Sequence, residues 1–126
     1  MERRRISSAQ PLESRYGYSR AIVVGNDVFV SGTVATMPDG SDPPADAYSQ
    51  ARLALEIIVA ALADAGAKPE DVVRTRMYVS RADDMRDVGR AHGEVFADAR
   101  PATTALVVEL IDPRWLVEIE AHAVLP

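Results

Sequence analysis

The side chains best suited to acid–base chemistry lie near the C-terminus of this 126-residue chain. Glu118 and Glu120 alternate along an apolar run, so both carboxylates fall on one face of a β-strand. A carboxylate whose pKa is raised by burial can act as a general base or hold an attacking water. The alternative for Glu118 is an ion pair on the strand face with Arg74 or Arg76, and Glu120 is the less favoured base.

Hydroxyl and imidazole groups add further candidates, each with a structural alternative. His92 lies on the apolar stripe of an expected helix, as a hydrogen-bonded core or interface group or as a proton-carrying group in a cleft. His122 is expected to be structural. Thr103 and Thr104 are either ordinary strand residues or hydroxyls in a cleft, and Tyr18 either closes over a ligand or packs on a hairpin.

Composition excludes several kinds of site. The chain has no cysteine, so disulfides, thiolate nucleophiles and zinc–thiolate sites are excluded. Its histidines and carboxylates show no metal-ligand spacing, and we expect no metal and no cofactor. The net charge of −5 argues against nucleic acid as a partner, since the only basic run is Arg3 to Arg5. No apolar run is long enough for a membrane span or a signal peptide, which favours a cytoplasmic protein.

Periodicity predicts one domain over residues 1–126 with the order β-β-α-β-α-β-β. Strands at 21–24 and 28–34 flank a Gly25-Asn26-Asp27 turn, which is typical of a hairpin. Within the second strand, Gly32 follows Ser31 and either permits a close backbone approach or marks a bulge. The remaining elements are helices at 45–65 and 83–96 and strands at 72–79, 103–110 and 116–125.

These elements predict an α+β fold in which two helices cover one face of the sheet. The other face mixes arginine, glutamate and histidine with tyrosine, leucine and valine. Such a face suits either solvent or a second subunit of complementary charge, and its apolar members favour an oligomer.

Ordered motifs give the chain a specific resemblance. Tyr18, VFVSGT, Gln50-Ala51-Arg52, DVVRTRMYV, the run from Arg100 to Thr103, and VEIEAHAV follow one another at near-constant spacing. The chain resembles the reactive-intermediate deaminase family, also called RidA or YjgF-like, over nearly its whole length. The resemblance implies a chorismate-mutase-like fold with a mixed sheet. It also implies a homotrimer whose sheets form a central barrel, with small molecules bound in three clefts between subunits. Members of this family hydrolyse enamines and imines to a 2-oxo acid and ammonia without metal or cofactor.

The resemblance also implies roles for individual residues. Glu118 takes the position of the glutamate that directs the attacking water, 15 residues after Thr103. The positions implied to bind substrate are Tyr18, Ser31, Gly32, His92, Thr103, Thr104 and Ala105. Ala105 stands at the family's cysteine position, and His92 stands where a tyrosine is often found.

Thr103 is the decisive departure, because it stands where the family has its carboxylate-binding arginine. A threonine offers one neutral hydroxyl, and losing a charge-assisted pair costs about 1.5–3 kcal/mol. Arg100, Arg114 or an arginine of a neighbouring subunit are the candidate replacements. The sequence therefore favours a homotrimer that binds a small metabolite and has altered or weak imine deaminase activity. The alternatives are a non-catalytic sensor or enzyme partner and, against the acidic charge, an endoribonuclease or translation inhibitor.

Overall fold

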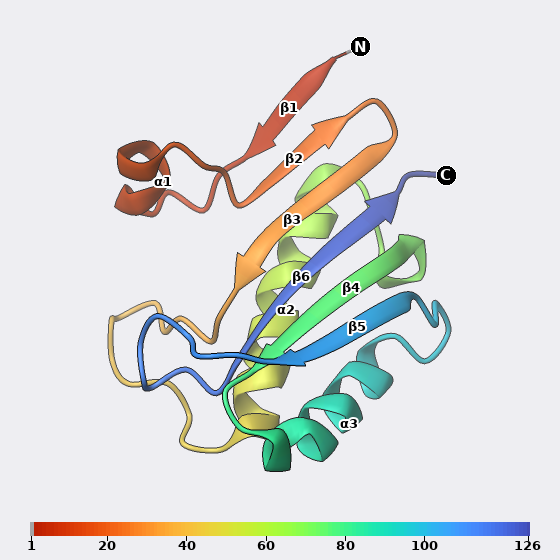
Figure 1. Ribbon diagram of the computed structural model, residues 1–126. Coiled ribbons are helices and arrows are strands. Elements are labelled where there is room, and N and C mark those ends of the chain that lie inside the picture. Colours follow the sequence, from red (N-terminus) through yellow and green to blue (C-terminus); the bar gives the residue numbers. More distant parts are fainter. Residues whose placement is uncertain (1) are drawn as a thin grey trace.

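The computed structural model describes residues 2–126 and is built on one six-stranded sheet (Figure 1). The strand order across the sheet is β1-β2-β3-β6-β4-β5. β4 and β5 are parallel and all other neighbouring strands are antiparallel, so the sheet is mixed, as expected. The strands are β1 (Arg3–Ile6), β2 (Ala21–Val24), β3 (Asp27–Thr33), β4 (Val72–Val79), β5 (Ala102–Val107) and β6 (Val117–Val124).

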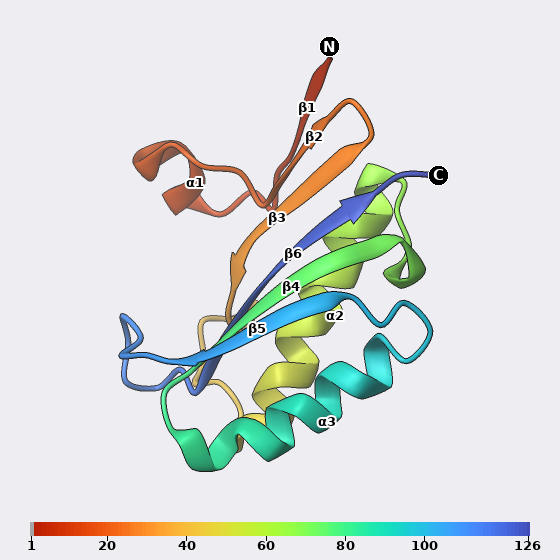
Figure 2. The ribbon, with the colours of Figure 1, turned by 45° about the vertical axis from the view of Figure 1, so that its right-hand side comes forward.

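Two long helices, α2 (Ala47–Ala65) and α3 (Met85–Val95), cover one face of this sheet (Figures 1 and 2). The side chain of Asp46 accepts a hydrogen bond from the Ser49 backbone N–H and caps the start of α2. Gly66 ends the helix in the left-handed conformation at φ 91°, which a glycine adopts without a Cβ clash. Short 3₁₀ turns at Pro69–Asp71 and Ala82–Asp84 lead into β4 and α3. Within residues 2–126, no helix has an apolar stretch long enough to cross a lipid bilayer.

The expected hairpin is present as β2 and β3, joined by Gly25 and Asn26. Gly25 has φ 61°, a conformation that a glycine adopts without a Cβ clash and that two-residue hairpin loops require. The strands expected at 103–110 and 116–125 are β5 and β6, but β4 lies between them. α3 supplies the crossover that the parallel β4–β5 pair needs. β5 ends earlier than expected because its partner β4 ends at Val79.

The sequence did not predict β1 or α1 (Pro11–Tyr16). The six residues of α1 are too few to show helical periodicity. Local side-chain contacts hold the segment instead, since the buried Glu13 carboxylate accepts hydrogen bonds from Ser7 Oγ and the Ser8 backbone N–H, both at 3.0 Å. β1 contains the three N-terminal arginines, and Arg4 donates to the Asp64 carbonyl at the end of α2 at 3.0 Å.

The sequence pattern of residues 72–79 predicts that Val73 shares the face of Thr75 and that Val72 lies on the opposite face. This prediction is wrong for both valines, because Val72 is 2% exposed and Val73 46%. The pairing of β4 with β6 shifts between Val72 and Arg74, so a bulge turns Val72 into the core. From Thr75 onward the expected alternation is confirmed.

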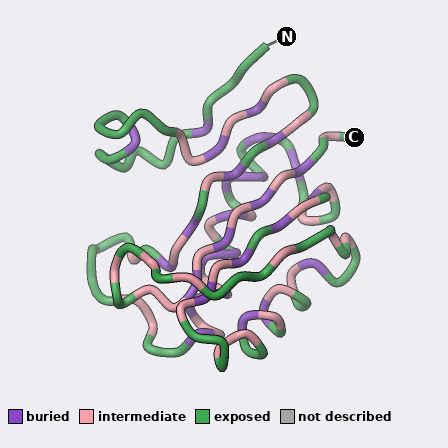
Figure 3. The backbone as a smooth tube through the Cα atoms, in the orientation of Figure 1, coloured by how far each residue is buried: buried purple, intermediate pink, exposed green. Residues whose placement is uncertain are grey.

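The two faces of the sheet differ sharply in their side chains. Buried positions alternate along the strands and gather between the sheet and its helices (Figure 3). The opposite face, called here the open face, keeps partly or fully exposed side chains on all the central strands. Its members are Phe29, Arg74, Arg76, Tyr78, Leu106, Glu118, Glu120 and His122. It is the mixed face that the sequence predicted.

Candidate functional site

A bulge in β3 places backbone directly against the Glu118 carboxylate. Val30 pairs with Ala121 and Thr33 with Ile119, so Ser31 and Gly32 together face one residue of β6. A Cβ atom at Gly32 would overlap Glu118 Oε2 and lie 3.1 Å from its Cδ. Both readings of Gly32 from the sequence are therefore confirmed: the residue marks a bulge and permits a close approach.

Glu118 has the electrostatic character of a candidate acid or base. Burial raises the pKa of its carboxyl group, the neighbouring Glu120 raises it further, and Arg20 opposes both effects. Within residues 2–126, no ion pair or side-chain hydrogen bond holds the Glu118 carboxylate. The alternative reading, a strand-face ion pair, applies to Glu120 instead. Glu120 lies 3.6 Å from Arg76 Nη1 and accepts a hydrogen bond from Tyr78.

Arg20 is a site residue that the sequence reasoning missed. Its Nη2 donates to the backbone carbonyls of Ser31 and Gly32, each at 2.9 Å. The guanidinium therefore fixes the bulge that faces Glu118. Its Nε is buried and has no hydrogen-bond partner in the described part of the chain. Burial lowers the pKa of Arg20, and the nearby Tyr18, Glu13 and Glu118 counter the effect. A charged residue two positions after Tyr18 was the only sequence signal for it.

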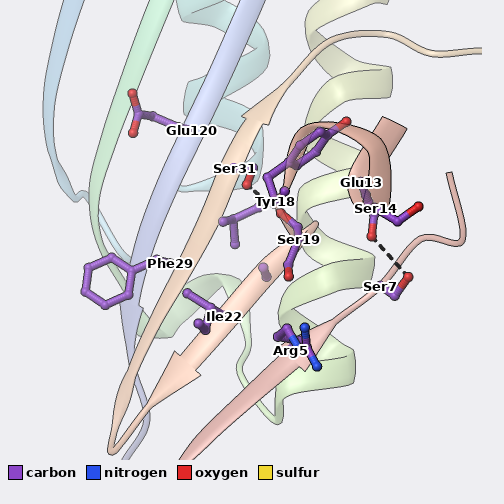
Figure 4. A pocket seen from close by; sticks show the side chains of 13 residues that line it. Arg5, Ser7, Glu13, Ser14, Tyr18, Ser19, Ile22, Phe29, Ser31 and Glu120 are labelled. Atoms are coloured by element: carbon purple, nitrogen blue, oxygen red, sulfur yellow. Dashed lines mark hydrogen bonds between the residues drawn. The ribbon is translucent and has the colours of Figure 1, made fainter. Parts of the chain in front are cut away.

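Tyr18 and Ser31 line a wide cleft of about 1050 Å³ between α1 and the open face of β2 and β3. The side chains of Tyr18, Ser19 and Ser31 lie near one another beside α1, while Phe29 and Glu120 stand on the strands (Figure 4). Ser31 Oγ donates to the Ser19 carbonyl at 2.6 Å, which fixes the entry into β2. Tyr18 is 42% exposed, so packing against the hairpin does not bury this residue.

A second group of candidate residues gathers on the helix side of the β5 edge. His92 Nε2 lies 2.8 Å from Thr75 Oγ1, and Thr75 Oγ1 lies 2.8 Å from Thr103 Oγ1. Thr75 is fully buried, whereas Thr103 is exposed. Burial lowers the pKa of His92, which keeps its ring neutral. His92 is thus a half-buried, hydrogen-bonded group whose contacts reach the edge of the sheet.

The neighbouring hydroxyl faces the other way. Thr104 Oγ1 accepts a hydrogen bond from Arg74 Nη2 at 2.7 Å on the open face, because successive strand residues alternate between faces. Ala105 lies opposite Met77 in the β4–β5 register. Arg114, a candidate replacement for the missing arginine, is bound to Asp112 and Asp42 at 3.0 Å each.

Arg100 has φ 45° at the turn into β5. Arg74 is the arginine that hydrogen-bonds Thr104, whereas the sequence suggested it only as an ion-pair partner of Glu118.

The candidate site residues therefore form two separate groups in the chain. Tyr18, Ser31, Gly32 and Glu118 gather around the β3 bulge, whereas His92 and Thr103 lie at the opposite edge of the sheet beyond β4. β6 and β4 separate the bulge from β5 in the strand order. His122 belongs to neither group: its Nε2 bonds Asp27 at 2.8 Å and its ring stacks on Phe29. Among residues 2–126, no cluster of three or more histidine or carboxylate side chains could hold a metal ion.

The order of these elements can be compared with known proteins. Residues 8–125 match the family model described as Endoribonuclease L-PSP. The chain belongs to the YjgF/RidA family. A YjgF/YER057c/UK114 family member from Mycobacterium tuberculosis has a crystal structure with a TM-score of 0.88 and 42% identity, covering 98% of this chain and 100% of that one. The fold class predicted from the sequence, a mixed sheet with helices on one face, is confirmed in this YjgF/RidA chain.

Two sequence relatives of this YjgF/RidA protein stand at different distances. An uncharacterized protein of Streptomyces coelicolor is 41% identical over 121 residues, which are 95% of this chain and 90% of the relative. The 2-iminobutanoate/2-iminopropanoate deaminase of Escherichia coli is 30% identical over 110 residues, 85% of this chain and 86% of that enzyme.

Proposed function

We propose that this YjgF/RidA protein is a homotrimer that binds a small imine or enamine in clefts between subunits. It hydrolyses the C=N bond to a carbonyl product and ammonia. The observation that carries this proposal is the state of Glu118. It is a half-buried carboxylate with a raised pKa, set against the backbone of Gly32 and without an ion pair among residues 2–126. The deaminase name of the Escherichia coli relative supports the reaction class.

In the proposed chemistry, the Glu118 carboxylate is the general base that activates the attacking water. A carboxylate with a raised pKa accepts a proton from water near neutral pH more readily than an ordinary one. The water oxygen attacks the imine carbon, the nitrogen takes up protons, and the C–N bond breaks to release ammonia. Tyr18 and Ser31 line the neighbouring cleft together with Glu120, and Arg20 holds the bulge that positions the Gly32 backbone.

The separation of the two groups supports the trimer. One small molecule cannot touch both the β3 bulge and Thr103 within a subunit, since β6 and β4 lie between them. A second copy that brings its β5 edge to the bulge would complete a cleft. Apolar side chains are available for such an interface, because Phe29 is 44% exposed and Leu106 50%. Ala105 and Thr104 would then line the cleft from the second subunit.

Two measurements test the proposal. Sedimentation equilibrium should give three times the chain mass of 13.6 kDa. The wild-type protein should accelerate ammonia release from freshly generated 2-iminopropanoate above the buffer rate, and Glu118→Gln should lower that acceleration by about 10²–10⁴-fold, the usual contribution of a general base. Activity that survives Glu118→Gln unchanged would remove Glu118 from the reaction.

Mixed trimers test whether the cleft is shared. Glu118→Gln subunits are co-refolded with Thr103→Trp subunits, whose indole would fill the β5 side of the cleft. If each variant is inactive alone, mixed trimers should recover part of the activity, because some interfaces then pair an intact bulge with an intact β5 edge. No recovery, with mixed trimers verified by mass spectrometry, would place both groups in one subunit's site or in separate sites.

Thr103 favours a second candidate, a metabolite-binding module without catalysis. In that case 2-oxo compounds bind, but no imine is hydrolysed faster than in buffer. RNA cleavage, which the name of the family model suggests, is less favoured because the chain carries a net charge of −5. Ribonuclease activity that is lost in Glu118→Gln would reverse that order.

A further inference from the structure

The hydroxyl chain that ends at Thr103 points to the class of ligand that this protein takes. Thr75 Oγ1 lies 2.8 Å from both His92 Nε2 and Thr103 Oγ1. His92 is half-buried, Thr75 is fully buried, and Thr103, at the outer end of the chain, is exposed. The hydrogen-bonded chain therefore runs from a half-buried imidazole through a buried hydroxyl to an exposed hydroxyl at the edge strand β5.

The number of protons in this hydrogen-bonded chain determines whether the Thr103 hydroxyl can donate to a ligand or accept from it. Thr75 has one hydroxyl proton and two partners, so it donates to one and accepts from the other. If Thr75 donates to Thr103, then Thr103 keeps its own proton for an outside acceptor. If Thr103 donates to Thr75, then Thr103 presents lone pairs to an outside donor. In both arrangements Thr103 presents one uncharged hydrogen-bonding group.

The hydrogen-bonded groups of this chain, two hydroxyls and an imidazole, are themselves uncharged near neutral pH. Burial lowers the pKa of His92, so the imidazole stays uncharged near neutral pH. Arg74 donates to Thr104 on the open face, away from the Thr103 side chain. On the helices, Arg52 pairs with Glu94 at 3.5 Å and Arg90 with Asp87 at 3.6 Å. Within residues 2–126, Thr75 is the only hydrogen-bond partner of the Thr103 hydroxyl.

A carboxylate would lose hydration at such a group without gaining a cation, whereas an uncharged carbonyl group would lose little. We propose that the β5 edge at Thr103 binds the uncharged carbonyl group of its ligand, with a carboxamide as the best match. A carboxamide supplies both a C=O acceptor and an N–H donor, so it fits either direction of the hydroxyl chain. The substrates of the proposed reaction are then 2-imino amides, which take up one water and yield a 2-oxo amide and ammonia.

This inference rests on the proposed function only in placing the ligand beside Thr103. A binding experiment tests the carboxamide preference separately from the proposed hydrolysis. Pyruvamide and pyruvate differ in the group that would meet Thr103 and serve as the probes. Titration calorimetry of the wild-type trimer should show pyruvamide binding at least about tenfold more tightly than pyruvate. The ¹⁵N signals of the His92 ring should shift with pyruvamide, because its hydrogen-bond chain gains an outer partner.

Matched variants assign the preference to the hydroxyl. Thr103→Val keeps the side-chain shape and should lose the preference and the His92 response, whereas Thr103→Ser should keep both. Thr103→Arg should reverse the preference toward pyruvate. Arg74→Gln removes the arginine that hydrogen-bonds Thr104 and should leave the preference unchanged. Melting curves of the four variants verify that each is folded.

Every other outcome contradicts the proposal. Pyruvate binding as tightly as pyruvamide, binding of neither compound, or an unaltered preference in Thr103→Val would overturn it. A preference that disappears in Arg74→Gln would assign recognition to Arg74 instead. Turnover is then measured on 2-iminopropanoate and 2-iminopropanamide, made by the same base elimination from N-chloroalanine and N-chloroalaninamide. Pyruvamide binding through Thr103 without turnover of either imine would contradict the proposed hydrolase activity and support the carboxamide preference. Faster turnover of 2-iminopropanoate than of 2-iminopropanamide would support the hydrolase activity and contradict the carboxamide preference.

Discussion

Gly32 is the residue that gives the Glu118 carboxylate its space, since a Cβ atom at position 32 would overlap Glu118 Oε2. Oε2 is the far end of a flexible side chain, so an added methyl group displaces the carboxylate and leaves the strands in place. The absence of one side chain on β3 therefore sets the position of the candidate base on β6.

Gly32→Ala is expected to lower the proposed hydrolysis rate by about 10²-fold or more, because a general base moved from its productive position loses most of its contribution. The melting temperature should change little. Gly93→Ala is the matched control, since a Cβ atom there meets nothing within 4 Å. Gly93 lies in the last turn of α3, and its replacement should add up to about 1 kcal/mol of stability without affecting the rate. A Gly32→Ala variant with full activity would show that the position of Glu118 does not matter.

Glu118→Gln is expected to change how the free energy of unfolding depends on pH. The folded-state pKa of Glu118 lies above its ordinary value of 4.5, so ionising this group destabilises the fold as pH rises through that raised pKa. The penalty is absent below about pH 4.5 and complete above the folded-state pKa. The free energy of unfolding of the variant minus that of the wild type should therefore be larger at pH 7 than at pH 4. Urea titrations at both pH values measure this difference, and a constant difference contradicts the raised pKa.

The neighbours of Glu118 should shift the acid limb of the pH–rate profile in opposite directions. Glu120 raises the pKa of Glu118 and Arg20 lowers it. Glu120→Gln should therefore move the acid limb of kcat/KM to lower pH, while its amide oxygen still accepts from Tyr78. Arg20→Gln should move the limb to higher pH. Shifts in the same direction for both variants would indicate that another group controls the limb.

Gln50→Leu is expected to destabilise the fold strongly. The Gln50 side chain is 1% exposed and bonds three backbone groups, donating to the carbonyls of Pro44 and Arg114 and accepting from the Leu116 N–H. Each buried group left without a partner costs about 1–3 kcal/mol, so a loss of about 3 kcal/mol or more is expected. Arg52→Met, on the exposed side of α2, breaks only the surface pair with Glu94 and should cost less than about 1 kcal/mol. Chemical denaturation of both variants tests the contrast.

Much of the fold could be predicted from the sequence because its signals are local. The β2–β3 hairpin follows from Gly25, the end of α2 from Gly66, and the strand at Val72–Val79 from its β-branched run. α1 could not be predicted, because its stability comes from the Glu13 contacts with Ser7 and Ser8 rather than from any helical period.

The candidate site could be predicted only in part, because some of its residues depend on contacts that motif spacing does not show. Glu118, Ser31 and Gly32 follow from motif spacing, and the structure does bring them together. The roles of Arg20 and Arg74 could not, since each depends on which backbone or hydroxyl a long flexible side chain reaches. The spacing also gave no indication that Glu120, and not Glu118, would take the ion pair with Arg76.

By itself the sequence determined the family, the fold class, and the presence of a threonine where the family has an arginine, because residue identity and periodicity are properties of the chain. Only the tertiary structure decided what surrounds those residues. It places β4 between β5 and β6, which separates Thr103 from Glu118, and it connects Thr103 through Thr75 to His92. Burial and hydrogen bonding depend on packing between distant segments, and no local pattern in the sequence encodes them.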